Sequence, residues 1–129
     1  MKKLIIFLAM LSVFACTESL EDKAARDAKE YTEKSCPTPV VDNSSTDSIT
    51  FDKQSKTFTY YFKLSGTADN PKIIEANRKK LYQIQQQALE NNPSLKVYKE
   101  AGYNYRCVYR STAHKDSVLM DFTFKFKKH

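Results

Sequence analysis

Three stretches of this chain place apolar and polar residues alternately, with the period of two that marks strands buried on one face only. The clearest is FTYYFKL at residues 58–64, and the segments 103–110 and 118–126 repeat the pattern. A shorter alternation at Ile49 and Phe51 precedes the first of them, across the turn-forming residues DKQSK. The sequence therefore predicts four strands arranged as two hairpins, one in each half of the chain.

The middle of the chain, residues 66–93, carries the clearest helical pattern. Its apolar residues recur at helical spacing and line one face: Ile74, Leu81, Ile84 and Ala88. Asn70 can cap this helix and Pro71 suits its first turn, whereas the NNP sequence at residues 91–93 ends it. Residues 94–101 then form a turn or a short helical piece before the next strand.

Residues 17–35 are rich in Ala, Glu and Lys and contain neither Gly nor Pro, which favours a helix. A thin apolar stripe would face the core: Leu20, Ala24, Ala28 and Tyr31. Ser19 can begin the helix, and CPTP at residues 36–39 ends it. The mixed charge of this stretch suits a solvated tether as well, so both interpretations stay open.

The elements follow the order α-β-β-α-β-β, which is typical of the α+β class. Because each hairpin has one polar, solvent-exposed face, we expect a four-stranded antiparallel sheet built from two hairpins, with helices packed on one face. The expected organisation is a leader at residues 1–15, a helix or tether at residues 16–35, and one small α+β domain at residues 36–129.

The leader MKKLIIFLAMLSVFA, residues 1–15, begins with two lysines, continues with an apolar run and ends on a small residue. This is the pattern of a signal peptide that directs export. The apolar run from Leu4 to Phe14 is shorter than the roughly 20 residues that a membrane-spanning helix needs. A permanent transmembrane helix is therefore the weaker alternative.

The leader continues directly into VFAC, residues 13–16, which resembles the lipobox of bacterial lipoproteins. The resemblance covers the first sixteen residues and implies that Cys16 becomes the first residue of a lipid-anchored protein, with a diacylglyceryl group on its thiol and an acyl chain such as palmitate on its amino group. Several acyl chains together hold a protein firmly in a membrane, whereas one does so only marginally. Thr17 follows Cys16 where lipoproteins retained in the inner membrane often carry Asp, so the outer membrane is expected in a Gram-negative host. The rest of the chain is loosely similar to small uncharacterised lipoproteins of the bacterial envelope, a likeness that implies no activity.

The chain has three cysteines, an odd number that leaves one thiol unexplained in an exported protein. If Cys16 carries lipid, Cys36 and Cys107 remain as a pair able to form a disulfide in an oxidising compartment. Two separate buried thiols are the alternative.

Few residues offer catalytic or metal chemistry. The two histidines, His114 and His129, lack the spacing of zinc ligands, so no metal site is expected, and the two glycines exclude a glycine-rich phosphate loop. A thiol- or histidine-dependent hydrolase would have to use Cys107 with His114, or His114 with Ser111. Cys107 falls on the apolar side of its strand, and no acid is placed by the sequence to orient His114. We expect neither catalysis nor a cofactor.

If the last two strands pair as predicted, basic and aromatic residues gather on the exposed face of the sheet. They are Lys63, Tyr61, Arg106, Arg110, Lys125 and Lys127. Such a face could hold an anionic ligand or an acidic protein of the envelope. The mildly basic mature chain agrees with this, since removing Lys2 and Lys3 with the leader reduces the formal charge from +6 to +4. Cations on strands also serve simply to prevent edge-to-edge association, so that alternative stays open. Nucleic acid is not expected as a partner of an exported chain.

These observations predict a protein of the cell envelope, anchored to the membrane through its lipidated N-terminus and facing the periplasm or the cell surface. We expect it to bind a ligand or a partner without catalysing a reaction. A structural subunit of an envelope complex is the first alternative, and the small hydrolase is the second.

Overall fold

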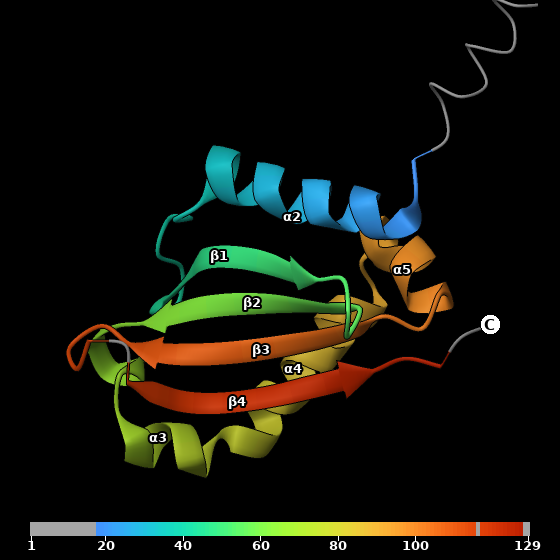
Figure 1. Cartoon of the computed structure of the whole chain (residues 1–129). Coiled ribbons are helices and arrows are strands. Elements are labelled where there is room, and N and C mark those ends of the chain that lie inside the picture. The colour runs from blue at the N-terminus through green and yellow to red at the C-terminus, as the bar shows by residue number, and fades with distance from the viewer. Residues whose placement is uncertain (1–17, 116, 128–129) are drawn as a thin grey trace, which may run out of the picture.

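The computed structural model describes residues 18–115 and 117–127, which form one four-stranded sheet and its covering helices (Figure 1). The elements are α2 (Leu20–Ser35), β1 (Ser44–Asp52), β2 (Thr57–Leu64), a 3-10 turn (Gly66–Ala68), α3 (Pro71–Ala76), α4 (Arg78–Glu90), a second 3-10 turn (Pro93–Leu95), α5 (Lys96–Glu100), β3 (Asn104–Ser111) and β4 (Val118–Lys125). At this level the structure has the α+β class and the element order that the sequence predicts. Within the described ranges, no helix has the length and apolarity that crossing a membrane requires. The leader and Cys16 lie outside these ranges.

The sheet differs from the prediction in its central pair. The strands lie in the order β1-β2-β3-β4, and the two hairpins β1–β2 and β3–β4 are antiparallel as predicted. The central strands β2 and β3 run parallel, so the expectation of an antiparallel sheet throughout is wrong. Between them, α3, α4 and α5 carry the chain back along the sheet, and such a helical crossover joins parallel strands. The alternation of apolar residues is the same in both arrangements and cannot distinguish them.

The helix predicted within residues 66–93 is in fact two helices, α3 and α4, joined at Asn77. The start is as predicted, because the side chain of Asn70 caps α3 and Pro71 occupies its first turn. The side-chain amide of Asn77 donates a hydrogen bond to the carbonyl oxygen of Ile73 at 2.8 Å. Asparagine side chains that bond to nearby backbone compete with the helical pattern, and the chain changes direction here.

A helix, and not a tether, occupies Leu20–Ser35. It begins as predicted, since the Ser19 hydroxyl accepts a hydrogen bond from the backbone N–H of Asp22 at 3.1 Å. The side chains that α2 buries fully are those of Ala24 and Ala28, and side chains this small allow the helix to lie close against the sheet.

Thr32 joins α2 to the outer edge of the sheet through two hydrogen bonds. Its hydroxyl donates to the carbonyl oxygen of Ile49 and accepts from the N–H of the same residue, both at 2.9 Å. The edge strand β1 thereby has these backbone groups satisfied by a side chain, which protects the edge from pairing with another strand.

The two faces of the sheet have different surroundings. One face carries the core, and its buried and half-buried rings are Phe58, Tyr60, Phe62, Tyr105, Tyr109, Phe122 and Phe124. The ring of Phe58 lies 5.3 Å from that of Tyr105 and 4.9 Å from that of Tyr98 on α5, measured between centroids. The opposite face, turned toward the viewer in Figure 1, has no helix in front of it.

The predicted disulfide between Cys36 and Cys107 is not formed in the structure, where both are free cysteines. Cys107 lies on β3 opposite Tyr60 of β2, and Tyr60 in turn lies opposite Ile49 of β1. Two strand spacings, about 10 Å, therefore separate Cys107 from the edge beyond which Cys36 ends α2. A disulfide tolerates a Cα separation of no more than about 7 Å.

Candidate functional site

The structure places the predicted binding residues on the uncovered face of the sheet or just beyond it. Tyr61 and Lys63 come from β2, Arg106 and Arg110 from β3, and Lys125 from the end of β4; Lys127 follows β4. Lys63 is the direct neighbour of Arg110 across β2 and β3, and Lys125 is the neighbour of Asn104 across β3 and β4. The register brings the basic residues to two ends of the face with Arg106 between them.

Arg106 is already paired with a carboxylate. Its Nε and Nη2 donate to the two oxygens of Asp121 on β4, at 2.9 and 2.5 Å. These hydrogen bonds hold the pKa of Asp121 below its usual range and raise the pKa of the Arg106 guanidinium. The middle of the predicted basic face is therefore neutral. The sequence pattern did not indicate this, because alternation along a strand does not give the register between β3 and β4.

Arg110 has a different environment. Its guanidinium carbon lies 4.3 Å from the centroid of the Tyr61 ring, a cation–π geometry. Its Nε is buried and lacks a hydrogen-bond partner, and no carboxylate of the described residues lies within ion-pair distance of it. The neighbouring Lys63 ammonium is 3.9 Å from the Asp47 carboxylate, a long and exposed contact. This end of the face retains unneutralised positive charge.

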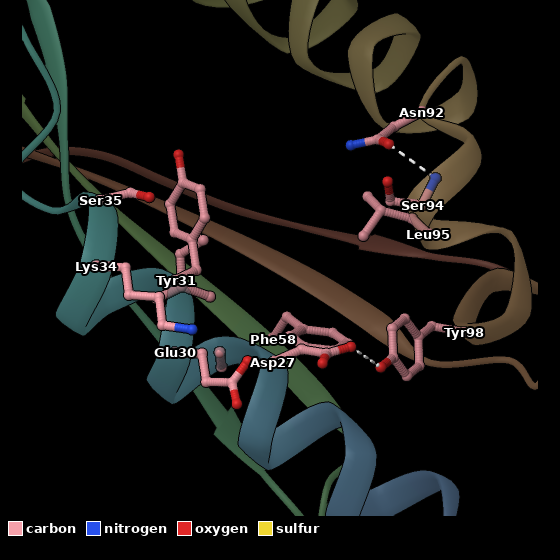
Figure 2. A pocket seen from close by; sticks show the side chains of 12 residues that line it. Asp27, Glu30, Tyr31, Lys34, Ser35, Phe58, Asn92, Ser94, Leu95 and Tyr98 are labelled. Atoms are coloured by element: carbon pink, nitrogen blue, oxygen red, sulfur yellow. Dashed lines mark hydrogen bonds between the residues drawn. The ribbon is translucent and has the colours of Figure 1, made fainter.

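A cleft of about 440 Å³ opens on the other side of the molecule, between α2 and the segment that leads into α5 (Figure 2). Its apolar lining consists of Ala28, Ile49, Phe58, Leu95 and the rings of Tyr31 and Tyr98. Polar side chains complete the lining: Asp27, Glu30, Lys34 and Ser35 from α2, and Asn92 and Ser94 from the opposite wall. Figure 2 shows Tyr31 and Ser35 on the α2 side of the opening and Asn92 and Ser94 on the other.

One end of the cleft is closed by a hydrogen-bonded network between α2 and α5. The Tyr98 hydroxyl donates to the Asp27 carboxylate at 2.6 Å, and the Lys23 ammonium donates to the same oxygen at 2.9 Å. Burial alone would raise the pKa of Asp27, but the hydrogen bonds from Tyr98 and Lys23 outweigh it and hold that pKa below its usual range. Burial and the bond to Asp27 raise the pKa of Tyr98. Asp27 is thus committed to this network. The rest of the cleft offers a ligand aromatic surface, hydroxyls, the amide of Asn92 and the charged side chains of Glu30 and Lys34.

No pattern in the sequence points to this cleft. Tyr31 falls on the apolar stripe of the first helix, and Asn92 belongs to the signal that ends the second. The two walls come from segments far apart in the chain, and only the crossover through α4 brings residues 92–98 opposite α2.

Cys107, the candidate nucleophile, lies in the core with 1% of its surface exposed. Burial raises the pKa of its thiol to about 12, so the thiol is protonated near neutral pH. A buried, protonated thiol neither reaches a substrate nor attacks one.

Ser111 and His114 do come together, at the turn after β3, with Asp69 as a third member that sequence reasoning missed. The Ser111 hydroxyl donates to Asp69 at 2.5 Å and accepts from the backbone N–H of His114 at 2.9 Å. Asp69 also accepts from the backbone N–H groups of Thr112 and Ala113. The hydrogen bond from Ser111 is the main cause that lowers the pKa of Asp69. Ser111 is 1% exposed and its partner is a carboxylate, so this arrangement orders the turn and presents no accessible nucleophile.

Within residues 18–115 and 117–127, no three side chains of His, Cys, Asp or Glu gather as ligands for a metal ion. His129 lies outside the described residues.

Comparisons with known proteins place the chain in a family and identify its fold. Residues 19–120, well over half of the chain, match the sequence model of a family described as "Domain of unknown function (DUF8479)". A crystal structure at 1.60 Å of a protein from Pseudomonas aeruginosa, described as a "putative secreted protein", superposes with a TM-score of 0.63 and 9% identity, over 84% of this chain and 95% of that one. At this identity the likeness identifies a shared fold and no more. The search of curated proteins found no match.

Proposed function

This chain belongs to the DUF8479 family, a domain of unknown function, and we propose that it is a lipid-anchored envelope protein that binds a small ligand without catalysis. The open cleft between α2 and α5 is the observation that carries the binding assignment. The secreted description of its structural neighbour and the VFAC sequence at residues 13–16 support the location.

The anchor is tested directly by intact mass spectrometry of the protein from the membrane fraction. We expect a chain that begins at Cys16 and carries the mass of a diacylglycerol group and one further acyl chain. Cys16→Ser should accumulate as an uncleaved, unlipidated precursor. A mature soluble chain with an unmodified Cys16 thiol would contradict the anchor and leave the cleft proposal untouched.

The dimensions and chemistry of the cleft suit a small molecule. Ligand pockets in proteins typically measure about 300–1,000 Å³ and combine an apolar lining with a few polar groups that set orientation. Here Phe58 and Tyr98 provide the deep aromatic surface, and Tyr31, which is 41% exposed, stands at the opening. Ser94 and Asn92 add polar groups on the opposite wall.

This arrangement favours a flat, largely apolar molecule with polar groups along one edge. The apolar part would lie against the rings, where its burial provides most of the affinity. The polar edge would face Asn92, Ser94 and Ser35, where hydrogen bonds select its orientation.

The dye anilinonaphthalene sulfonate, an aromatic molecule with a single anionic polar group, serves as a defined probe. We expect saturable binding of one dye molecule to the native protein, detected by fluorescence. Ser94→Trp fills the opening and should weaken this binding at least tenfold. Gln83→Trp, at an exposed position on α4 away from the cleft, is the matched control and should leave it unchanged. Equal binding by both variants with unaltered melting temperatures would refute the cleft as the site.

A further inference from the structure

We infer that the uncovered face of the sheet holds a separate binding site, at which Arg110 and Lys63 take a carboxylate of an acidic polysaccharide. The site lies on the face opposite the core and shares no residue with the cleft. The choice of a polysaccharide rests on the envelope location proposed above.

Arg110 is the centre of the site because its guanidinium is held in place and yet unpaired. The guanidinium carbon lies over the Tyr61 ring at 4.3 Å from its centroid, a contact that restrains the group. Its Nε–H is buried without an acceptor, and no carboxylate of the described residues pairs with the group, so its positive charge is not neutralised from within the chain. A guanidinium is a planar fork of donors that matches the two oxygens of a carboxylate, and a restrained one has lost part of its freedom before the ligand arrives.

Lys63 provides the second cation. It lies directly opposite Arg110 in the parallel register, so both side chains project from the same point of the same face. Its contact with Asp47 spans 3.9 Å between partners whose side chains are 44% and 34% exposed, and exposed pairs of this kind contribute little. A ligand carboxylate between Arg110 and Lys63 can therefore compete with Asp47.

Arg106, on the same face, differs from Arg110 because it already has a carboxylate partner. The Nε and Nη2 edge of its guanidinium already meets both oxygens of Asp121, so its charge is paired and its demand for an external anion is smaller than that of Arg110. The affinity of the face for anions should therefore depend on individual residues and not simply on its net charge.

The far end of the face carries a second basic group. Lys125 lies opposite Asn104, six residues before Arg110 on β3, and a strand of that length spans about 20 Å. Lys125 is exposed and takes part in no ion pair among the described residues, whereas Lys127, which follows β4, lies at a hollow that Glu90 and Glu100 also line. Two cationic ends separated by a neutral centre fit an extended ligand with charges at intervals.

The groups between the two ends favour a sugar chain over other polyanions. Thr123, which is exposed, and Asn104, which is half-buried, present a hydroxyl and an amide on this face. Such groups can exchange hydrogen bonds with the hydroxyls of successive sugar rings. A flat face without a helix in front of it leaves room for a chain lying along β3.

The test titrates oligogalacturonates, as single sugars and as long oligomers, into the mature chain (residues 16–129) carrying Cys16→Ser. This form retains every described contact, because these lie within residues 18–127. Arg110→Gln should weaken binding of both ligands at least tenfold by calorimetry. Arg106→Gln removes one charge from the same strand and is the matched control, with an expected change below threefold. The pair of substitutions Lys125→Gln and Lys127→Gln should weaken the long oligomer alone.

Equal losses for Arg110→Gln and Arg106→Gln in folded variants would overturn the site and leave only a general charge effect. Equal affinity for neutral maltooligosaccharides, or for polyphosphate with the same dependence on Arg110, would overturn the choice of ligand. Ser94→Trp should leave oligogalacturonate binding unchanged, so the outcome is independent of the cleft, and mass spectrometry tests the anchor separately.

Discussion

The two faces of the sheet are built from alternate residues of the same four strands, but one face packs into the core and the other carries charged side chains. On the covered face, rings such as Phe58 and Tyr105 pack on one another and on the helices, and their position is set by shape. On the uncovered face, the charges of Arg106 and Asp121 neutralise one another. Arg110 has no carboxylate partner among the described residues, so its charge remains for a ligand. The comparison teaches that binding capacity on an open sheet follows from incomplete pairing and not from the number of cations.

The largest difference is expected between the reaction rates of the two thiols, because one lies in the core on the covered face and the other at the end of α2. Cys107 is 1% exposed with a pKa near 12, whereas Cys36 is only half-buried at the end of α2. In the native mature protein carrying Cys16→Ser, Ellman's reagent should label Cys107 more than about a hundredfold more slowly than Cys36. Both should react in denaturant. Finding no reactive thiol after unfolding without reductant would mean that the two are bridged.

Removing a ring from the covered face should be the most costly substitution for stability. Phe58→Ala deletes a buried side chain that contacts several rings, and we expect a loss of about 3–5 kcal/mol in the free energy of unfolding. Thr123→Ala on the uncovered face should cost no more than about 0.5 kcal/mol. Urea titration measures both, and similar values for the two would break the distinction between the faces.

A substitution at the edge of the sheet should cause an intermediate loss in the free energy of unfolding. Thr32→Val keeps the shape of the side chain but removes both hydrogen bonds to Ile49, leaving partly buried backbone groups unpaired at a cost of about 1–3 kcal/mol. Hydrogen exchange of the Ile49 amide should accelerate in the variant. An unchanged exchange rate of the Ile49 amide would contradict the role of the Thr32 hydroxyl in protecting the edge of β1.

The smallest effect is expected for the paired charges of the uncovered face. Arg106 and Asp121 are 44% and 38% exposed, so Asp121→Asn should cost no more than about 1 kcal/mol at neutral pH. Because Arg106 depresses the pKa of Asp121, this contribution is present above the unfolded value of about 3.9 and is lost as the pH falls through the folded pKa. Unfolding curves of wild type and variant should therefore converge at low pH. A difference that persists under acid would assign the loss to something other than the charge.

Features that depend on neighbours in the chain could be predicted from the sequence. The caps at Ser19 and Asn70, the two hairpins and the sidedness of the strands all follow from patterns only a few residues long. The break between α3 and α4 at Asn77 was not predicted, because the apolar stripe of the helix continues across it. An asparagine within a helical pattern does not by itself indicate that the helix ends there. Of the candidate site, the residues of the uncovered face were predicted, but the pairing of Arg106 was not.

The sequence by itself determined which side of each strand is apolar, where α2 and α3 begin and which basic residues share a face, since these depend on periods of two and 3.6 residues and on capping residues close in the chain. Only the tertiary structure decided that β2 and β3 are parallel, that α2 and α5 enclose a cleft, and that Arg106 is neutralised while Arg110 is not. Each of these depends on where a long crossover places distant segments, and alternation along a strand is the same whichever neighbour the strand acquires.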